Sequence, residues 1–211
     1  MTKQDQLKRA AAEKAVEFVP ENEYIGIGTG STINFFIEAL GKSGKKIKGA
    51  VTTSKKSSEL MAQYEIPEIA ANEVSRLSIY IDGADEINHT LQMIKGGGGA
   101  HLPKKIVANL ADQFICIADE SKYVSRLGKF PLPIEVIPMA RSMVARQIAK
   151  LGGQPRIAYW LQKPARQRHF GRNGLGFEPT ADNGARIEPN HRFGGKRFVC
   201  RTRCRFADFG A

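Results

Sequence analysis

Hydrophobic positions switch between helical and strand spacing along the first 150 residues. In residues 4–19, apolar side chains recur at one helical face: Leu7, Ala10, Ala11, Ala15, Val16 and Val19. Further along, short apolar runs that end in glycine or acidic turns alternate with helical segments. The pattern predicts strands within 24–30, 47–54, 77–85 and 114–122, and helices over 4–19, 31–44, 57–66, 103–114 and 137–153. This alternation with short links predicts an α/β fold, a doubly wound parallel sheet of the Rossmann-like kind.

A proline-rich segment at 130–138, FPLPIEVIP, interrupts this alternation. We interpret it as the boundary to a second, smaller α+β domain. The predicted organisation is a Rossmann-like domain over 1–130, the start of the smaller domain over 131–155, and an anomalous arginine-rich tail over 156–211. The smaller domain is therefore expected to be incomplete here.

Composition excludes several classes of protein. The chain has 211 residues, of which 42% are hydrophobic and 25% charged, as in ordinary globular proteins. No apolar run approaches the roughly 18 residues that span a bilayer, so no membrane association is expected. The N-terminus lacks the pattern of a secretory signal, which predicts a cytoplasmic location. Three scattered cysteines, Cys116, Cys200 and Cys204, indicate neither a disulfide framework nor a zinc site.

Polar loops follow the predicted strands, where open parallel sheets bind ligands. The first, GIGTGST, can hold a phosphate through the hydroxyls of Thr29, Ser31 and Thr32 and through helix amides. It is neither a Walker A loop nor a full GxGxxG fingerprint. The alternative interpretation is a tight turn with a helix N-cap. A fourth loop carries Ser121 and Lys122, although a single lysine at a strand end is commonly solvated.

Two other loops carry charge. Asp82 and Asp85 lie three residues apart, and such carboxylates repel each other unless a ligand or cation lies between them. They are candidates for holding sugar hydroxyls, a metal or protons, and the alternative is an Asx-turn. Lys95 precedes four glycines, a run that favours close approach of the backbone to a ligand. Lys95 could then neutralise an oxyanion, and the alternative is a flexible loop.

Taken in order, these segments carry a family resemblance. GIGTGST, IDGADEIN, MIKGGGGA, CIADESK and LGKFPLPIEVIPMAR closely resemble ribose-5-phosphate isomerase of the A type, from about Gln4 to Pro155. The resemblance implies a cytoplasmic enzyme of the pentose phosphate pathway. It would interconvert ribose 5-phosphate and ribulose 5-phosphate through an enediolate, with no cofactor and no required metal. The resemblance also implies a homodimer or homotetramer.

The resemblance also implies a set of site residues. The substrate-binding positions would be Lys8, Thr29, Gly30, Ser31, Thr32, Gly83, Ala84, Gly96, Gly97, Gly98 and Lys122. The catalytic positions would be Asp82, Asp85, Lys95 and Lys104. In these roles, hydroxyls and helix amides hold the phosphate, the carboxylates exchange protons with sugar oxygens, and Lys95 with glycine amides stabilises the enediolate.

The chain departs from the family at the general base. The family has a glutamate nine residues after the lysine of the glycine loop, and Lys104 stands there. A base must be unprotonated near pH 7, which for a lysine of pKa about 10.4 requires a shift of about 3 units. The simple alternative is a solvated helix lysine. Activity is therefore expected to be impaired, and the alternative function is a non-catalytic sugar-phosphate binding protein on the same scaffold.

The tail is a second departure. Residues 1–155 hold 20 basic and 17 acidic residues, whereas residues 156–211 hold 12 and 4. Codons chosen freely for Arg156 to Lys163 can, read one base later, spell the family-like segment ELRIGFK. We therefore hypothesise an off-frame tail that packs poorly. The alternative is a basic arm that binds RNA or acidic surfaces through interleaved Arg201, Arg203, Arg205, Phe198, Phe206 and Phe209, although no nucleic-acid partner is expected.

Overall fold

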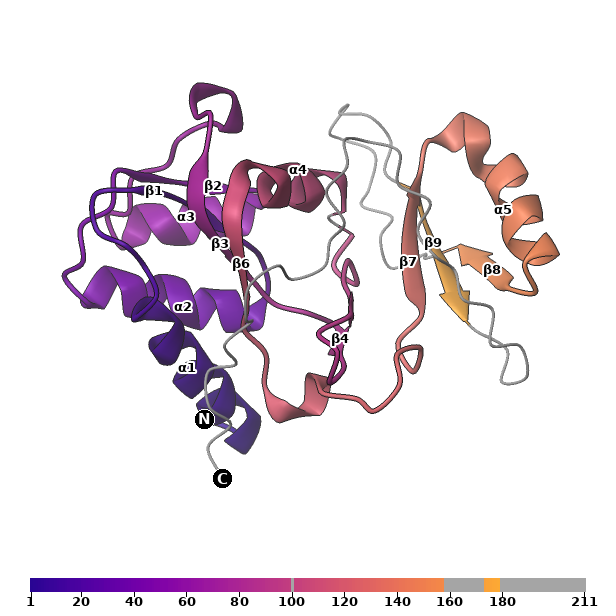
Figure 1. Ribbon diagram of the computed structural model, residues 1–211, viewed down its shortest axis with the longest axis horizontal. Helices are drawn as coiled ribbons and strands as arrows, with labels where there is room; N and C mark the ends of the chain where they lie inside the picture. The colour runs from indigo at the N-terminus through magenta and orange to yellow at the C-terminus, as the bar shows by residue number, and fades with distance from the viewer. Residues whose placement is uncertain (100, 158–172, 179–211) are drawn as a thin grey trace.

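The computed structural model describes residues 1–99, 101–157 and 173–178. One part holds a parallel sheet and the helices α1 to α4, and the other holds a second sheet with helix α5, as Figure 1 shows. The short strand β4 (Glu86–Ile87) lies between these two parts in that view.

The first sheet is entirely parallel. Its strands are β1 (Tyr24–Ile27), β2 (Gly49–Thr52), β3 (Leu77–Asp82) and β6 (Ala111–Cys116), in the order β2-β1-β3-β6. The helices of this part are α1 (Lys3–Val16), α2 (Ser31–Lys42), α3 (Lys55–Gln63) and α4 (Leu102–Leu110), with 3-10 turns η1 (Ala71–Glu73) and η2 (Glu120–Lys122). This topology confirms the predicted doubly wound α/β sheet.

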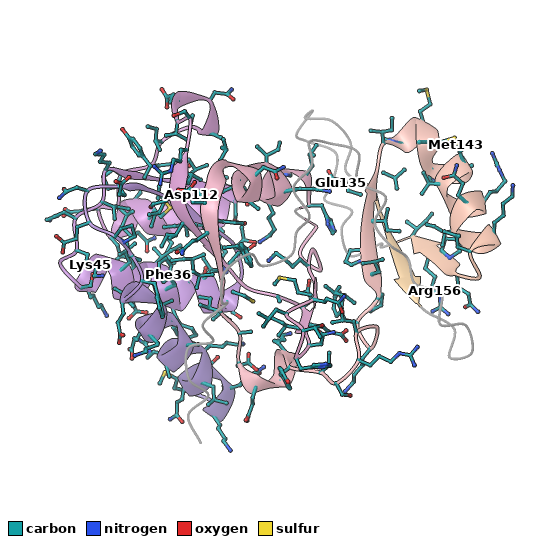
Figure 2. All side chains as sticks on the ribbon, viewed as in Figure 1. Phe36, Lys45, Asp112, Glu135, Met143 and Arg156 are labelled. Atoms are coloured by element: carbon teal, nitrogen blue, oxygen red, sulfur yellow. The ribbon has the colours of Figure 1, made fainter. Side chains whose placement is uncertain are left out.

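Successive side chains of β3 point to opposite faces of the sheet and pack in two different apolar clusters. Ile79 and Ile81 pack in one apolar cluster with residues of α1, α2 and α3, including Phe36, which Figure 2 labels. Tyr80 points to the opposite face and packs with Val107 of α4. Successive strand residues face opposite sides, and helices therefore cover both faces of the sheet.

Strand order places a topological switch point between β1 and β3. From β1 the chain crosses through α2 to β2 on one side, and it later returns to β3 on the other side. Ligands of open α/β sheets bind at the carboxyl ends of the two strands at such a point. The loops that begin at Thr29 and at Asp82 leave β1 and β3 there, so both candidate loops meet at one edge.

The second part is an antiparallel sheet with one helix. Strands β7 (Leu132–Val136), β8 (Gln154–Ile157) and β9 (Asn173–Glu178) pair in the order β7-β9-β8. Helix α5 (Arg141–Lys150) follows the 3-10 turn η3 (Pro138–Ala140), and Ile148 of α5 packs with Val136 of β7. The placement of domain boundaries at residues 130 and 155 stays a prediction.

One local expectation was wrong, and two strand features were not predicted. The predicted helix over 103–114 ends at Leu110, and Ala111 begins β6 with no linker between them. The proline segment at 130–138 contains strand β7, since its prolines lie where the strand can accommodate them. The segment before Lys95 also forms an unpredicted hairpin, in which β4 pairs with β5 (Met93–Ile94).

The predicted tail is only partly described. Residues 156–157 belong to β8, and residues 173–178 form β9, the central strand of the second sheet. The hypothesis that residues 156–211 are off-frame and pack poorly stays a prediction. The proposed basic arm at 198–209, as well as Cys200 and Cys204, lies outside the described residues.

Two further sequence observations concern the described residues. Cys116 is buried and free, as its apolar surroundings predict, and burial raises the pKa of its thiol to about 11. In the part of the chain that the structure describes, no helix is long and apolar enough to cross a membrane.

Replacing Gly28 by alanine is expected to destabilise the fold. A Cβ at this position would lie 2.0 Å from Oδ1 of Asp82, on a strand that cannot move away. Overpacking of this kind costs typically about 1–3 kcal/mol. The matched control is Gly98→Ala, because a Cβ there meets nothing within 4 Å. Equal free energies of unfolding for the two variants in urea titrations would contradict this account.

Candidate functional site

The carboxylate of Asp82 lies at the centre of the candidate site. Asp82 ends β3 and is completely buried. Its Oδ2 accepts a hydrogen bond of 2.8 Å from the Tyr80 hydroxyl, and its Oδ1 accepts 2.9 Å and 3.2 Å bonds from the amides of Gly83 and Thr29. The Thr29 bond ties the loop after β1 directly to the loop after β3.

Two lysines from other segments share this carboxylate. Lys104 Nζ, from α4, lies 2.9 Å from Oδ1 and 2.7 Å from Oδ2 of Asp82. Lys95 Nζ, which follows β5, lies 2.9 Å from Oδ2 and also donates to the carbonyl of Gly83. The Lys104 side chain is only 11% exposed. The expectation of a solvated lysine at position 104 was therefore wrong, because the helix turns this side chain inward.

Opposite charges and burial set the ionisation of this group. Burial on its own would raise the pKa of Asp82, but Lys95 and Lys104 outweigh it and the pKa lies below the usual range. Burial lowers the pKa of Lys104, Asp82 opposes that shift, and Lys95 reinforces it. Burial, followed by the Asp82 charge, raises the pKa of Tyr80, so its hydroxyl remains a donor.

Two glycines at the end of β1 create the space for this cluster. A Cβ on Gly26 would lie 2.6 Å from the Tyr80 ring, and a Cβ on Gly28, one residue beyond the strand, would lie 2.0 Å from the Asp82 carboxylate. These two glycines of the predicted phosphate loop GIGTGST therefore serve packing.

The loop after β1 presents an uncapped helix start. Gly30 is the N-cap of α2 with φ of +118°, a conformation that favours glycine, and no side chain caps the helix. The N-cap of the alternative interpretation is therefore Gly30, which forms no side-chain hydrogen bond. The first-turn amides of α2 lie beside Ser31, which is exposed, and Thr32, which is half-buried. Such a helix start favours an anion.

The glycine loop is a hydrogen-bonded turn held by the second carboxylate. The amide of Gly97 donates to Oδ2 of Asp85 at 2.8 Å, and the amide of Gly99 donates to the carbonyl of Gly96 at 2.9 Å. Asp82 and Asp85 thus bind different partners, which relieves the repulsion expected between them. Ala84 is half-buried between the two aspartates, and Gly98 is exposed.

The remaining predicted residues lie around the loop after β6. Lys122 ends η2, which Asp119 caps by accepting a 3.0 Å bond from the Ser121 amide. Gln4 of α1 approaches the Ser121 hydroxyl at 3.5 Å, and Lys8 lies one helical turn further along α1. Lys8 and Lys122 thus belong to two segments that the Gln4–Ser121 contact joins.

Sequence reasoning missed three residues near the site. Tyr80 could have been found, because strand period places it on the same face as Asp82. Glu86, which follows the acidic turn, is buried and accepts bonds from the amides of Gly128 and Phe130. His101 packs its ring against Gly96, and burial lowers its pKa. Neither the Glu86 nor the His101 contact has a local sequence signal.

Residues of the second part also approach α4. The amide of Leu102 donates to Oε2 of Glu135 on β7 at 2.8 Å, and Figure 2 labels Glu135 between the two parts. Within residues 1–99, 101–157 and 173–178, no cluster of three or more histidine, cysteine, aspartate or glutamate side chains could hold a metal ion.

An open parallel sheet with an uncapped helix start and a lysine-paired carboxylate at its switch point defines an α/β protein that binds a small anionic ligand. Residues 49–165 match the sequence profile of ribose 5-phosphate isomerase A (phosphoriboisomerase A). A ribose-5-phosphate isomerase A of Neisseria meningitidis is 77% identical over 161 residues, which are 75% of this chain and 72% of that protein. The chain belongs to the ribose 5-phosphate isomerase A family.

Solved structures agree with this assignment. The ribose 5 phosphate isomerase A of Neisseria gonorrhoeae superposes with a TM-score of 0.78 at 66% identity, over 85% of this chain and 78% of that one. A D-ribose-5-phosphate isomerase in complex with phospho-erythronic acid gives a TM-score of 0.76 at 31% identity, over 84% of this chain and 80% of that one. Both similarities include the Rossmann-like fold.

Replacing Asp82 by asparagine is expected to destabilise the chain in a pH-dependent way. Removing one partner of a buried ion pair costs about 3–5 kcal/mol. Because the pKa of Asp82 is lower in the folded than in the unfolded chain, its contribution is present above about pH 3.9 and is lost as pH falls through the folded value. The deficit of the variant, measured by urea unfolding, should therefore shrink below about pH 4.

The matched control is Asp112→Asn, which removes an exposed ion pair with Arg76. Its cost should stay under about 1 kcal/mol. A deficit for Asp82→Asn that is equally small at pH 7 would show that the cluster does not stabilise the fold.

Proposed function

We propose that this chain interconverts ribose 5-phosphate and ribulose 5-phosphate through an enediolate. The observation that carries the proposal is the Asp82 cluster, which joins the loop after β1, the acidic turn, Lys95 and helix α4 in one place. Those are the segments in which the sequence resembles the family. The names of the relatives support the same reaction.

In this proposal the phosphate binds at the start of α2. The hydroxyls of Thr29, Ser31 and Thr32 and the helix amides donate hydrogen bonds to it, and Lys8 and Lys122 supply positive charge from the flanking segments. The open helix start supports this placement. The related isomerase bound to phospho-erythronic acid, a phosphorylated sugar acid, supports a ligand of the same chemical class.

The sugar would extend from there toward the glycine loop. Asp85 and the amides of Gly96, Gly97 and Gly98 are proposed to bind its hydroxyls, with Gly83 and Ala84 lining the acidic turn. Lys95 would stabilise the negative charge of the enediolate, since an ammonium in a partly buried site favours an oxyanion strongly. We propose no cofactor for this reaction.

We propose that this chain differs from the other members of its family at the general base. Lys104 holds the position that a glutamate has in the family, and it is paired with Asp82. Asp82 is a poor substitute, because five donors surround it and its pKa is low. The chain would therefore bind substrate and turn it over slowly. In the extreme it would act only as a sugar-phosphate binding protein.

We also propose that the chain acts in the cytoplasm as a homodimer or homotetramer. Apolar side chains are exposed on η3 and α5, with Met139 at 92% and Ile137 at 63% exposure. Exposed apolar clusters of this kind are common at protein–protein interfaces.

Removing the hydroxyls of the helix start should weaken substrate binding. In Ser31→Ala/Thr32→Ala, each lost hydrogen bond to the charged phosphate costs about 1.5–3 kcal/mol. The dissociation constant of ribose 5-phosphate, measured by calorimetry, should rise at least about a hundredfold. Ser58→Ala, an exposed hydroxyl that bonds Glu68, is the control and should change nothing. Unchanged binding in the double variant would exclude this phosphate site.

Restoring a carboxylate at position 104 should restore turnover. A positioned base contributes about 10²–10⁴-fold, so Lys104→Glu should raise kcat for ribose 5-phosphate at least about a hundredfold. Affinity should change little, because the base meets a C–H bond and not the phosphate. The neighbouring Lys105→Glu makes the same change of charge on an exposed side chain and should not raise kcat.

The assay should include a version of the chain whose residues 156–211 are replaced by the family's C-terminal segment, so that a defect of the tail does not mask the gain. Full activity of that version with Lys104 in place would show that the base lies elsewhere. Absence of both turnover and ribose 5-phosphate binding in every version would overturn the proposed function itself.

A further inference from the structure

Lys104 is a buried amine to which the proposed isomerisation assigns no step. Its side chain is 11% exposed, and its Nζ contacts both oxygens of Asp82. Lys95 contacts one of the same oxygens at 2.9 Å. Two ammonium groups thus share one carboxylate, which leaves one positive charge without a partner in this cluster. Losing a proton from one amine removes that charge, which is costly to bury.

The two lysines have different surroundings. Lys95 has further stabilising partners for its charge, namely the Gly83 carbonyl and the face of Phe114, whose centroid lies 5.4 Å from Nζ. Its side chain is also more exposed, at 23%. Burial and the nearby Lys95 charge both lower the pKa of Lys104. A desolvated lysine beside a second cation is the arrangement that makes an amine nucleophilic.

We propose that Lys104 Nζ forms an imine with the C1 aldehyde of an open-chain aldose phosphate bound in this site. The inference rests on the proposed function, which places the sugar phosphate here and the reacting carbons beside position 104. It adds a covalent step that a glutamate at this position cannot perform. Lys104 is thus a nucleophile in a site whose other groups are those of an isomerase.

The groups that contact Asp82 supply and take up the protons that imine formation requires. The lone pair of neutral Nζ attacks C1, forming the C–N bond, and the carbonyl π electrons move to oxygen. The Lys95 ammonium, which shares Oδ2 of Asp82 with Lys104, protonates this oxygen and takes a proton from the nitrogen. It then protonates the hydroxyl, which leaves as water when the C–O bond breaks. The neutral Lys104 amine, the Lys95 ammonium and the aldehyde thus give a protonated imine, a neutral Lys95 amine and water. No oxidant or reductant is needed.

Reductive trapping tests the proposal on the full chain. The protein is incubated with ribose 5-phosphate and cyanoborohydride near pH 7, digested and analysed by mass spectrometry. Because binding gives the aldehyde a high effective concentration at Lys104, that residue should acquire the reduced sugar phosphate at least about tenfold faster than Lys105. Labelling should saturate with ribose 5-phosphate, and phospho-erythronic acid, which has no aldehyde, should suppress it.

Matched variants separate the outcomes. Lys104→Arg should lose the specific label, whereas Lys105→Arg should keep it. Calorimetry on the same samples reports whether ribose 5-phosphate binds. Binding without preferential labelling of Lys104, or labelling that phospho-erythronic acid does not suppress, overturns the imine alone. Absence of binding overturns the proposed function together with this inference.

Discussion

A buried carboxylate needs hydrogen-bond donors and positive charge around it. The partners of the Asp82 carboxylate therefore determine how the segments at the carboxyl edge of the parallel sheet are arranged. Its two oxygens accept hydrogen bonds from the Tyr80 hydroxyl on the same strand and from amides of two loops. They also form ion pairs with lysines from two further segments. Thr29, Lys95 and Lys104 come from three segments that are distant from Asp82 along the chain. Pairing at Asp82 therefore holds the loop after β1, the glycine loop and α4 at the switch point of the sheet.

Much of this arrangement follows from sequence pattern. Alternating strands and helices predicted the parallel sheet, and the rule for open sheets placed the polar loops at its carboxyl edge. Other features could not be predicted, because they depend on contacts between distant segments. Gly26 and Gly28 belong to the predicted phosphate loop, but they make room for Tyr80 and Asp82. The end of α4 was missed because no glycine or proline separates Leu110 from Ala111.

Lys104 shows most clearly what tertiary structure adds. In the sequence it was either an implausible base or a solvated lysine, since local pattern does not show which way a helix faces. In the structure it is neither exposed nor unpaired, because Asp82 draws it inward. In the proposed function, a cation thus stands where the reaction needs a base, and the site contains a second amine. The proposed phosphate site at the start of α2 would not depend on that change, so binding and turnover are expected to diverge.

The central claim is that Lys104 is a buried partner of Asp82, and an NMR titration of its side-chain amine tests it most directly. With selectively labelled lysine, Lys104 should titrate below the ordinary value of about 10.4, because burial and Lys95 disfavour its charge. Its pKa should fall further in Asp82→Asn, since the carboxylate is the group that favours the charged form. An ordinary lysine pKa, unchanged by Asp82→Asn, would contradict the account.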